Sequence, residues 1–378
     1  MKRYLAPLLL KDLQKKIVLL SGPRQVGKTT LSTLLDKSFE YLNYDRLEDR
    51  RKILSVQWDR KKSLWVFDEI HKMKNWKRWL KGIADTEKKN QILVTGSAKL
   101  NTFKKVGDSM AGRYLEYQLM PLDLKELKDY GSESPEKKFE KLWNLSGFPE
   151  PYLSGSEAEY KRWRKTHLDV MIRQDLPELE AVRRITDIEL LFELMKERVA
   201  SPLSHNSLRE DLQTDDKSIK RWLTWLENSY TLFKVSPFSK NLKYSLKKAP
   251  KYYLFDYPRI KDPGARLENL VALALHKELL LRNDRDGENY SLHYLQDKFH
   301  HEIDFLICND RKPISMIEVK TSDQEASRNF GIFYPHLKSL NPSLRQIQLV
   351  KGLSRPFSTK DGIEVEPLIP WLVEVDFG

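Results

Sequence analysis

The feature of this sequence that most constrains its fold is an apolar run that leads into a glycine-rich turn and then a helix. Ile17-Val-Leu-Leu20 is typical of a buried strand, and Thr29 opens a segment with helical spacing. The turn between them, Gly22-Pro-Arg-Gln-Val-Gly-Lys-Thr29, fits the pattern G-x-x-x-x-G-K-[ST]. Backbone N–H groups in such a turn, together with the helix N-terminus, attract phosphate oxygens. The segment therefore predicts an α/β sheet with a nucleoside triphosphate site.

This turn also assigns roles to individual residues. Lys28 would reach the β- and γ-phosphates, and Thr29 would ligate Mg²⁺. ATP and Mg²⁺ are therefore the expected cofactors. The residues expected around the phosphates are Gly22, Pro23, Arg24, Gln25, Val26, Gly27, Lys28, Thr29 and Thr30.

A second buried run, Ser63-Leu-Trp-Val-Phe67, ends in two acidic residues. We expect Asp68 to hold the magnesium ion and Glu69 to polarise the attacking water. The simpler alternative is that the two acids only cap a helix. Their distance of about 40 residues from the phosphate loop favours the catalytic interpretation.

Two later segments are expected to complete the nucleotide site. Gln91-Ile-Leu-Val-Thr95-Gly-Ser97 predicts a strand between the first two, where Thr95 or Ser97 would sense the γ-phosphate; a capping turn is the alternative. Arg113 follows a helical stretch and is a candidate arginine finger acting on a neighbouring copy, which implies a homo-oligomer. The alternative for Arg113 is an ordinary surface arginine.

The middle of the chain predicts helices and then a winged helix. A short helix at 207–212 and a longer one at 217–230 precede two strand-like runs, which a lysine-rich loop (239–251) separates. Ile219, Trp222, Leu223 and Leu226 have the spacing of one buried face. The residues expected on the DNA-binding face are Lys217, Lys220 and Arg221. The alternative is a rigid adaptor with a solvated basic face.

The tail predicts a helix from Glu268 and then a hairpin. If the hairpin is symmetric about Arg311, Asp304 lies opposite Glu318, with Lys320 on the same face. Two carboxylates and a lysine suit Mg²⁺-dependent phosphodiester hydrolysis, with Lys320 activating the water and Glu268 as a third acid. The pattern is similar to the PD-(D/E)xK nuclease signature, although no proline precedes Asp304. A surface ion pair, or a nuclease fold that binds without cutting, are the alternatives; His300 and His301 are expected to be solvated.

Five segments give the chain a family resemblance. GPRQVGKTT, VFDEIHKMKNWKRWLK, LVTGSA, AGRYLEYQLMPLDLKEL and SGFPEPYL resemble prokaryotic AAA-type ATPases that carry a C-terminal domain of unknown function. The resemblance covers essentially the whole chain. The motifs above predict three domains: an α/β P-loop ATPase domain (1–130), a helical and winged-helix domain (131–257) and an α/β nuclease-like domain (258–378).

Composition narrows the class of function. The formal net charge of +12 favours a polyanionic partner such as DNA. No apolar run is long enough to cross a membrane, and the single cysteine, Cys308, suits the reducing cytoplasm. We therefore expect ATP hydrolysis coupled to DNA binding or processing. The alternative is a nucleotide-controlled binding switch whose tail docks nucleic acid or a protein without cleaving.

Overall fold

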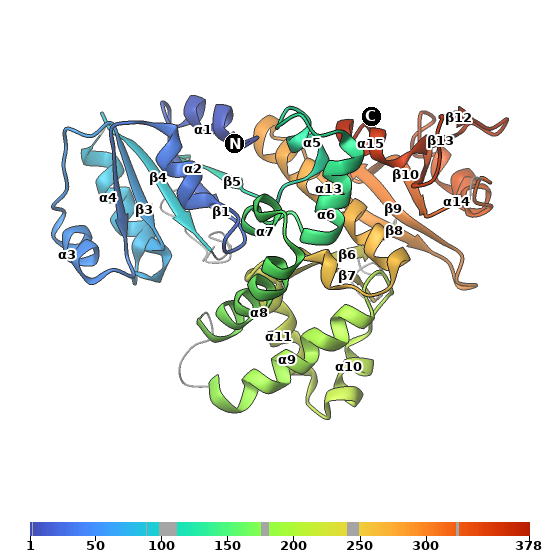
Figure 1. Cartoon of the computed structure of the whole chain (residues 1–378), viewed down its shortest axis with the longest axis horizontal. Coiled ribbons are helices and arrows are strands. Elements are labelled where there is room, and N and C mark those ends of the chain that lie inside the picture. Colours follow the sequence, from blue (N-terminus) through green and yellow to red (C-terminus); the bar gives the residue numbers. More distant parts are fainter. Residues whose placement is uncertain (2, 88, 98–111, 175–180, 240–248, 323–324) are drawn as a thin grey trace. The chain divides into compact units, whose positions relative to one another are not determined.

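The computed structural model describes the chain except residues 2, 88, 98–111, 175–180, 240–248 and 323–324, and no side chains at 172–184. The described residues form two compact units (Figure 1). The first comprises Met1–Pro121 with Asn228–Tyr230. The second comprises Leu122–Glu227 with Thr231–Gly378.

A five-stranded parallel sheet forms the centre of the first unit. Its order is β2 (Phe39–Asn43), β3 (Leu64–Asp68), β4 (Gln91–Gly96), β1 (Ile17–Ser21) and β5 (Tyr114–Gln118). The prediction that the third strand lies between the other two is confirmed, since β4 pairs with both β1 and β3. The helices are α1 (Ala6–Asp12), α2 (Lys28–Leu35), α3 (Leu47–Ser55) and α4 (Trp76–Thr86).

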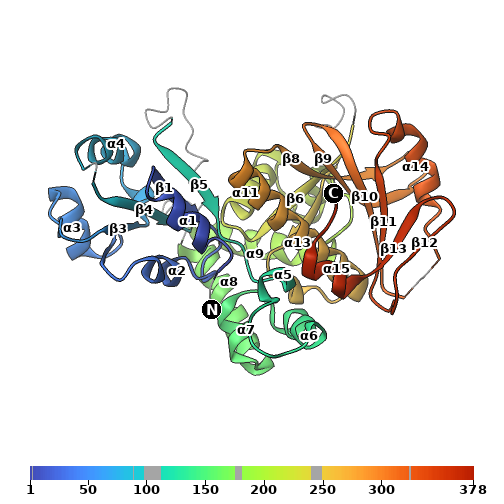
Figure 2. The ribbon, with the colours of Figure 1, turned by 90° about the horizontal axis from the view of Figure 1, so that it is seen from above.

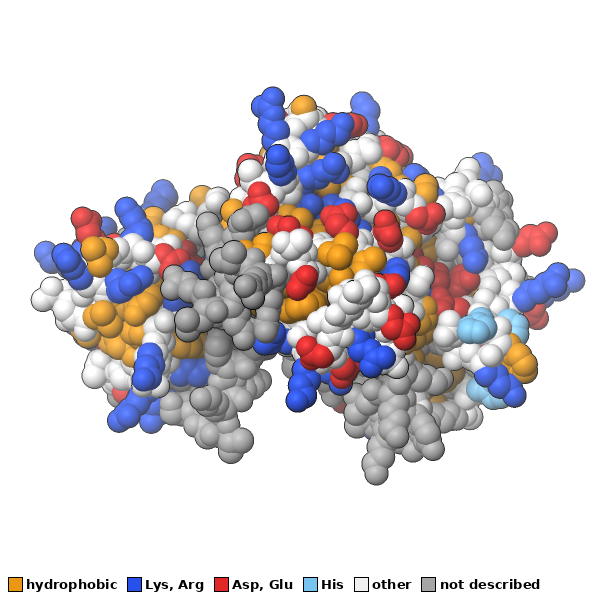
Figure 3. Space-filling view, turned by 90° about the horizontal axis from the view of Figure 1, so that it is seen from below, with side chains coloured by type: hydrophobic (Ala, Val, Ile, Leu, Met, Phe, Trp, Pro, Cys, Tyr) orange, Lys and Arg blue, Asp and Glu red, His pale blue; other side chains and the backbone are white. Residues whose placement is uncertain are grey.

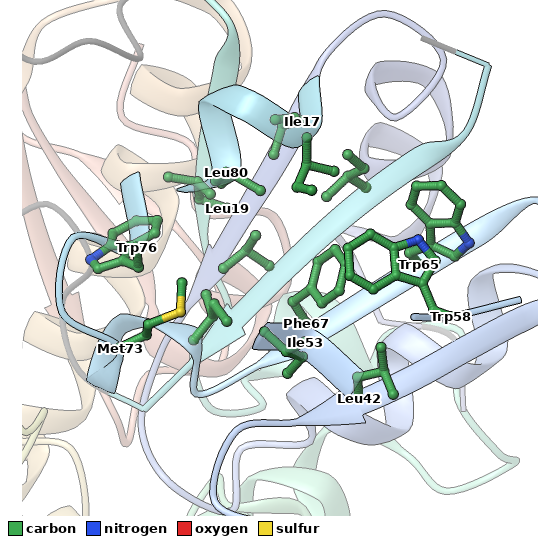
Figure 4. Packing of buried hydrophobic residues seen from close by; sticks show 14 residues of the cluster. Ile17, Leu19, Leu42, Ile53, Trp58, Trp65, Phe67, Met73, Trp76 and Leu80 are labelled. Atoms are coloured by element: carbon green, nitrogen blue, oxygen red, sulfur yellow. The ribbon is translucent and has the colours of Figure 1, made fainter. Parts of the chain in front are cut away.

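Aromatic packing fixes the strand that carries the acidic pair. Every residue of β3 is buried, which explains its continuous apolar sequence. Trp58 packs edge-to-face on Trp65 and Phe67, with ring centroids 5.4 and 5.3 Å apart (Figure 4). Such pairs add specific geometry to the burial of apolar area. The end of β3, at Asp68, is therefore held firmly.

The second unit is built on an eight-stranded sheet. Its order is β12 (Phe357–Ser358), β13 (Ile363–Pro367), β11 (Arg345–Val350), β10 (Lys312–Lys320), β9 (Glu302–Asn309), β8 (Tyr290–Gln296), β6 (Leu232–Pro237) and β7 (Lys251–Leu254). The long helix α13 (Pro263–Asp286) lies on one side of the strands, and α14 (Asn329–Lys338) lies on the other (Figure 2). α15 (Leu368–Glu374) follows β13 near the C-terminus.

The remaining helices lie before β6 in sequence. They are α5 (Leu124–Leu127), α6 (Pro135–Leu145), α7 (Pro149–Ser154), α8 (Glu157–Gln174), α9 (Ala181–Glu197), α10 (His205–Leu212) and α11 (Asp216–Asn228). The predicted pair of helices at 207–212 and 217–230 is present as α10 and α11. None of the helices in the described chain is long and apolar enough to cross a bilayer.

The observed strands differ from the predicted wing in one respect. β6 and β7 form the expected antiparallel hairpin, but β6 also pairs in parallel with β8 through Ser236 and His293. All four residues of β7 are buried, and the Asn269 amide of α13 bonds both backbone groups of Leu254. These strands pack against α13 and β8, and both sides of the boundary expected at 257/258 belong to one compact unit of the described chain, so that boundary stays a prediction. Most of the lysine-rich loop, 240–248, lies outside the described residues.

Candidate nucleotide site and acidic cluster

The phosphate loop has the backbone shape that an anion site needs. Gly22 has φ 151°, and a side chain there would collide with the backbone oxygen of Leu119. Gly27, the residue before α2, has φ 96°. The buried Lys28 ammonium crosses the loop and donates to the backbone oxygens of Gly22 (2.8 Å) and Pro23 (2.7 Å). These contacts give the loop a defined shape, and its composition fits a triphosphate.

Strands on both sides orient the Asp68 carboxylate. Thr95 Oγ1, on β4, donates to Asp68 Oδ1 over 2.5 Å, and Asn43 Nδ2, on β2, donates to Oδ2 over 3.3 Å. The Tyr41 hydroxyl also donates to Asp68 Oδ2. Burial, and then Asp68, raise the pKa of Tyr41 to about 12, while a hydrogen bond with Thr29 opposes the rise. The phenol thus donates to Asp68 and lies near Thr29.

These contacts bear on the expected magnesium ion. Thr29 and Asp68 supply the oxygen ligands that Mg²⁺ prefers, and the Tyr41 phenol lies near both, so the residues fit the ion. Sequence reasoning missed Tyr41 and Asn43. Their alternation on one short strand was the available signal, but it does not reveal what lies across the sheet.

The Glu69 carboxylate lies against the end of β4. The backbone N–H of Ser97 donates to Glu69 Oε1 over 3.1 Å, and the Ser97 hydroxyl lies 3.4 Å from Oε2. His71 Nε2 and Lys72 Nζ approach the same carboxylate at 3.5 and 3.7 Å. The structure thus places Thr95 beside Asp68 and Ser97 beside Glu69.

Arg113 lies at the other end of the sheet from the phosphate loop. Its backbone oxygen accepts from Ile17 N, at the start of β1, whereas the loop follows the end of that strand. Its side chain is 41% exposed, and its Nε lies 3.3 Å from Asp85 Oδ1. A cleft of about 480 Å³ lies here and is lined in part by Lys15, Lys16 and Arg113. Arg113 therefore does not join its own chain's site, and action on a neighbour stays a prediction.

The candidate DNA-binding face lies on α11. Ile219, Trp222, Leu223 and Leu226 are buried, as their spacing predicted. Lys217, Lys220 and Arg221 are exposed on α11, and Lys220 Nζ pairs with Asp216 Oδ2 over 2.6 Å. Among the described residues on the face in Figure 3, basic side chains are interspersed with acidic ones. On this face the described side chains therefore form no single broad basic surface.

A bulge sets the register of the tail hairpin. The turn is Asp310-Arg311, both with positive φ, and β9 and β10 pair as Asn309–Lys312 and Cys308–Pro313. Ile314 is then an extra residue, after which Ile307 faces Ser315 and Phe305 faces Ile317. Continuing this register places Asp304 opposite Glu318. Val319 N donates to Asp304 Oδ2 over 2.8 Å.

Four carboxylates gather where these strands meet α13: Glu268, Glu302, Asp304 and Glu318, here called the acidic cluster. Burial, and then the charge of Asp304, raise the pKa of Glu268 to about 8 and that of Glu318 to about 7. Burial also raises the pKa of Asp304 and Glu302. Lys320 Nζ pairs with Glu318 Oε1 over 2.8 Å, whereas Glu318 Oε2 is buried without a hydrogen-bond partner.

Lys251, which sequence reasoning missed, enters this cluster from β7. Its fully buried ammonium lies 3.0 Å from Glu268 Oε1 and 2.5 Å from Glu302 Oε1. The Tyr253 hydroxyl donates to the same Glu268 oxygen over 2.7 Å. A lone lysine beside apolar residues in β7 was the only sequence signal.

The expected tail metal site does not fit these contacts. Glu268 was predicted to complete the site with Asp304 and Glu318, but its Oε1 is held by Lys251 and Tyr253. Within the described residues, no group of three histidine, cysteine or acidic side chains is arranged to hold a metal ion. His301 is 45% exposed and pairs with Asp297 over 2.8 Å, away from the cluster.

Three family models match successive parts of the chain. Residues 14–128 match an AAA domain, 136–257 match a domain of unknown function (DUF8612), and 263–369 match a second (DUF4143). The parallel sheet, the phosphate loop and the match to the AAA domain all indicate the same kind of domain. The first unit is an AAA-type P-loop ATPase domain of α/β fold.

Relatives span nearly the whole chain. An uncharacterized protein of Methanocaldococcus jannaschii is 25% identical over 96% of this chain and 89% of its own length. One of Haemophilus influenzae is 23% identical over 95% of this chain and 94% of its own. A solved STAND ATPase of Pyrococcus horikoshii gives a TM-score of 0.24 at 13% identity, over 72% of this chain and 45% of that one. That structural likeness is too low to bear on fold or function.

Proposed function

We propose that this protein binds and hydrolyses ATP in its first unit and couples turnover to DNA binding through α11. The observation that carries the proposal is that Lys28 follows β1 while Asp68 and Glu69 stand at the end of β3, a strand of the same parallel sheet. Parallel strands present their carboxyl ends to one edge of a sheet, which is where α/β proteins bind ligands.

The residues of this edge suit phosphoryl transfer to water. Lys28 would leave its two loop carbonyls for the β- and γ-phosphates and stabilise the charge that develops on the transferred group. Thr29 and Asp68 would hold Mg²⁺, which offsets phosphate charge when bound with ATP. Glu69, held by Ser97, would orient a water molecule and polarise its O–H bond.

The DNA part of the proposal is supported by charge and shape. The chain carries a formal net charge of +12, and α11 exposes three basic side chains opposite a buried stripe. A helix of this kind can enter a major groove and place cations near phosphates. If Arg113 acts as a finger, it acts on another copy, so the working form is a homo-oligomer.

A cytoplasmic location is part of the same proposal. Cys308, the single cysteine, is buried, and burial raises the pKa of its thiol to about 12. A buried, protonated thiol is unreactive and suits a reducing compartment.

The second candidate is a nucleotide-controlled switch that hydrolyses slowly and uses its tail for docking. The contacts of Lys251 with the acidic cluster favour it, because they leave the tail poorly suited to metal-dependent cleavage.

ATP turnover, measured with and without single-stranded, duplex and branched DNA, separates the two candidates. The coupled ATPase requires severalfold stimulation by at least one of these DNAs. Unchanged turnover, together with DNA affinity that differs between ATP and ADP, supports the switch. No hydrolysis of any nucleoside triphosphate would overturn both.

A further inference from the structure

We propose that the Lys251 ammonium is the resident cation of the acidic cluster, so that the second unit takes up no divalent metal there. The inference concerns the second unit and is independent of the nucleotide chemistry of the first. It goes beyond the proposed function because it decides between metal-dependent cleavage and metal-free binding in the tail.

Lys251 sits in a site built for a cation. Its Nζ contacts one oxygen of Glu268 and one of Glu302, and it lies 5.3 Å from the centre of the Tyr294 ring. Two carboxylates and an aromatic face satisfy an ammonium group. The side chain is fully buried, so water does not replace these contacts.

The backbone keeps the ammonium in place. Lys251 belongs to β7, where it pairs with Val235 and forms a bridge with Pro202. The ring of Tyr294 faces the ammonium. Its hydroxyl donates to the backbone oxygen of Ala249 over 2.6 Å. Moving the ammonium away would leave two partly buried carboxylates facing each other without a counter-ion, which is unfavourable.

The carboxylates have other partners as well. Glu302 Oε2 accepts from Gln296 over 3.0 Å, and Asp304 Oδ2 accepts from Val319 N. Glu318 Oε1 pairs with Lys320. A divalent ion that binds through these oxygens would have to displace their donors, and one bound elsewhere in the cluster would still lie beside a fixed positive charge.

The balance of charges accounts for the buried Glu318 Oε2, which has no hydrogen-bond partner among the described residues. Four carboxylates face two ammonium groups, Lys251 and Lys320, so full ionisation leaves two negative charges uncompensated. A proton on Glu318 reduces this excess, in keeping with its raised pKa and its unbonded Oε2. Protons and lysine ammonium groups thus neutralise the carboxylate charge that a bound metal ion would otherwise neutralise.

The test uses the full chain with Asp68→Asn, which removes the acidic one of the two residues expected to hold metal in the nucleotide site. Manganese binding is measured without nucleotide by calorimetry and by electron paramagnetic resonance. We expect no bound Mn²⁺ at millimolar concentrations. We also expect Lys251→Met, added to this background, to create a site that Asp304→Asn removes.

Lys234→Met is the matched control, since it removes the same charge from β6, the strand paired with β7, where Lys234 is half-exposed. It should gain no metal. Binding of Mn²⁺ by the Asp68→Asn protein that Asp304→Asn abolishes would overturn the proposal, and this comparison requires no change at Lys251. A folded Lys251→Met chain that gains no site would also overturn it.

Discussion

The Tyr41 hydroxyl donates to Oδ2 of Asp68 and lies near Thr29, so one phenol stands beside both residues expected to hold Mg²⁺. Tyr41 lies on β2, and Asp68 ends the neighbouring β3. The acid is thereby oriented before any metal binds. Such preorganisation reduces the cost of assembling a site when the ligand arrives.

Tyr41→Phe should weaken both this orientation and the fold. A hydrogen bond to a charged group contributes about 1.5–3 kcal/mol, so the free energy of unfolding should fall by up to that amount. The Mg²⁺ concentration for half-maximal ATP turnover should rise severalfold. Tyr44→Phe is the control, because the Tyr44 ring faces Arg50 instead. An unchanged magnesium requirement in Tyr41→Phe would show that the phenol does not orient the metal ligands.

Lys28→Ala and Glu69→Gln should separate ATP binding from hydrolysis. Lys28→Ala removes the charge over the loop, and turnover should drop at least about 100-fold. Glu69→Gln should retain nucleotide binding and lose turnover, since Asp68 is untouched. Glu48→Gln, an exposed acid on α3, is the control. Parental turnover in Glu69→Gln would exclude Glu69 as the group that polarises water.

Arg113→Ala tests action on a neighbouring chain. Its position at the start of β5, away from the phosphate loop, leaves action in trans as the catalytic role to test. Specific activity should rise with protein concentration, and the variant should bind ATP but lose turnover. A mixture of Arg113→Ala and Lys28→Ala chains should recover part of the activity. Parental turnover of Arg113→Ala alone would identify Arg113 as a surface residue.

Sequence reasoning succeeded where the signal is local. A strand, a glycine-rich turn and a helix predicted the phosphate loop, and two further apolar runs predicted the central strands. Symmetry about Arg311 also paired Asp304 with Glu318. The real turn is shorter, however, and only the bulge at Ile314 restores that pairing.

What the sequence did not reveal depends on contacts distant in the chain. Nothing near Lys251 indicates Glu268 or Glu302, 17 and 51 positions away. Likewise, the pairing of β6 with β8 joins segments that lie far apart in sequence. Local spacing reports which face of an element is buried, but not which partner covers it.

Reversing the charges of Lys217, Lys220 and Arg221 tests the α11 face. Log affinity falls linearly with log salt concentration. The magnitude of this slope should decrease by about 0.9 for each cation that no longer neutralises a phosphate, hence by up to about 3 in total. Binding should weaken without unfolding, because these side chains are exposed. The same reversal at Lys161, Arg162 and Lys165 of α8, also exposed, is the control. Equal weakening in both variants would point to net charge rather than to α11.

Glu318→Gln should remove part of the pH dependence of stability. The pKa of Glu318 is about 7 in the folded protein and near 4.5 in the unfolded chain, so the folded state binds more protons between these values. Its stabilising contribution is therefore complete below about pH 4 and is lost as the pH rises to about 7. The slope for one extra bound proton is about 1.4 kcal/mol per pH unit at most. Urea unfolding from pH 5 to 8 should show stability falling in the parent and falling less in Glu318→Gln. Glu159→Gln, which changes an exposed acid on α8, should behave like the parent. Equal slopes in all three proteins would show that Glu318 ionises normally, and that the acidic cluster does not hold its proton.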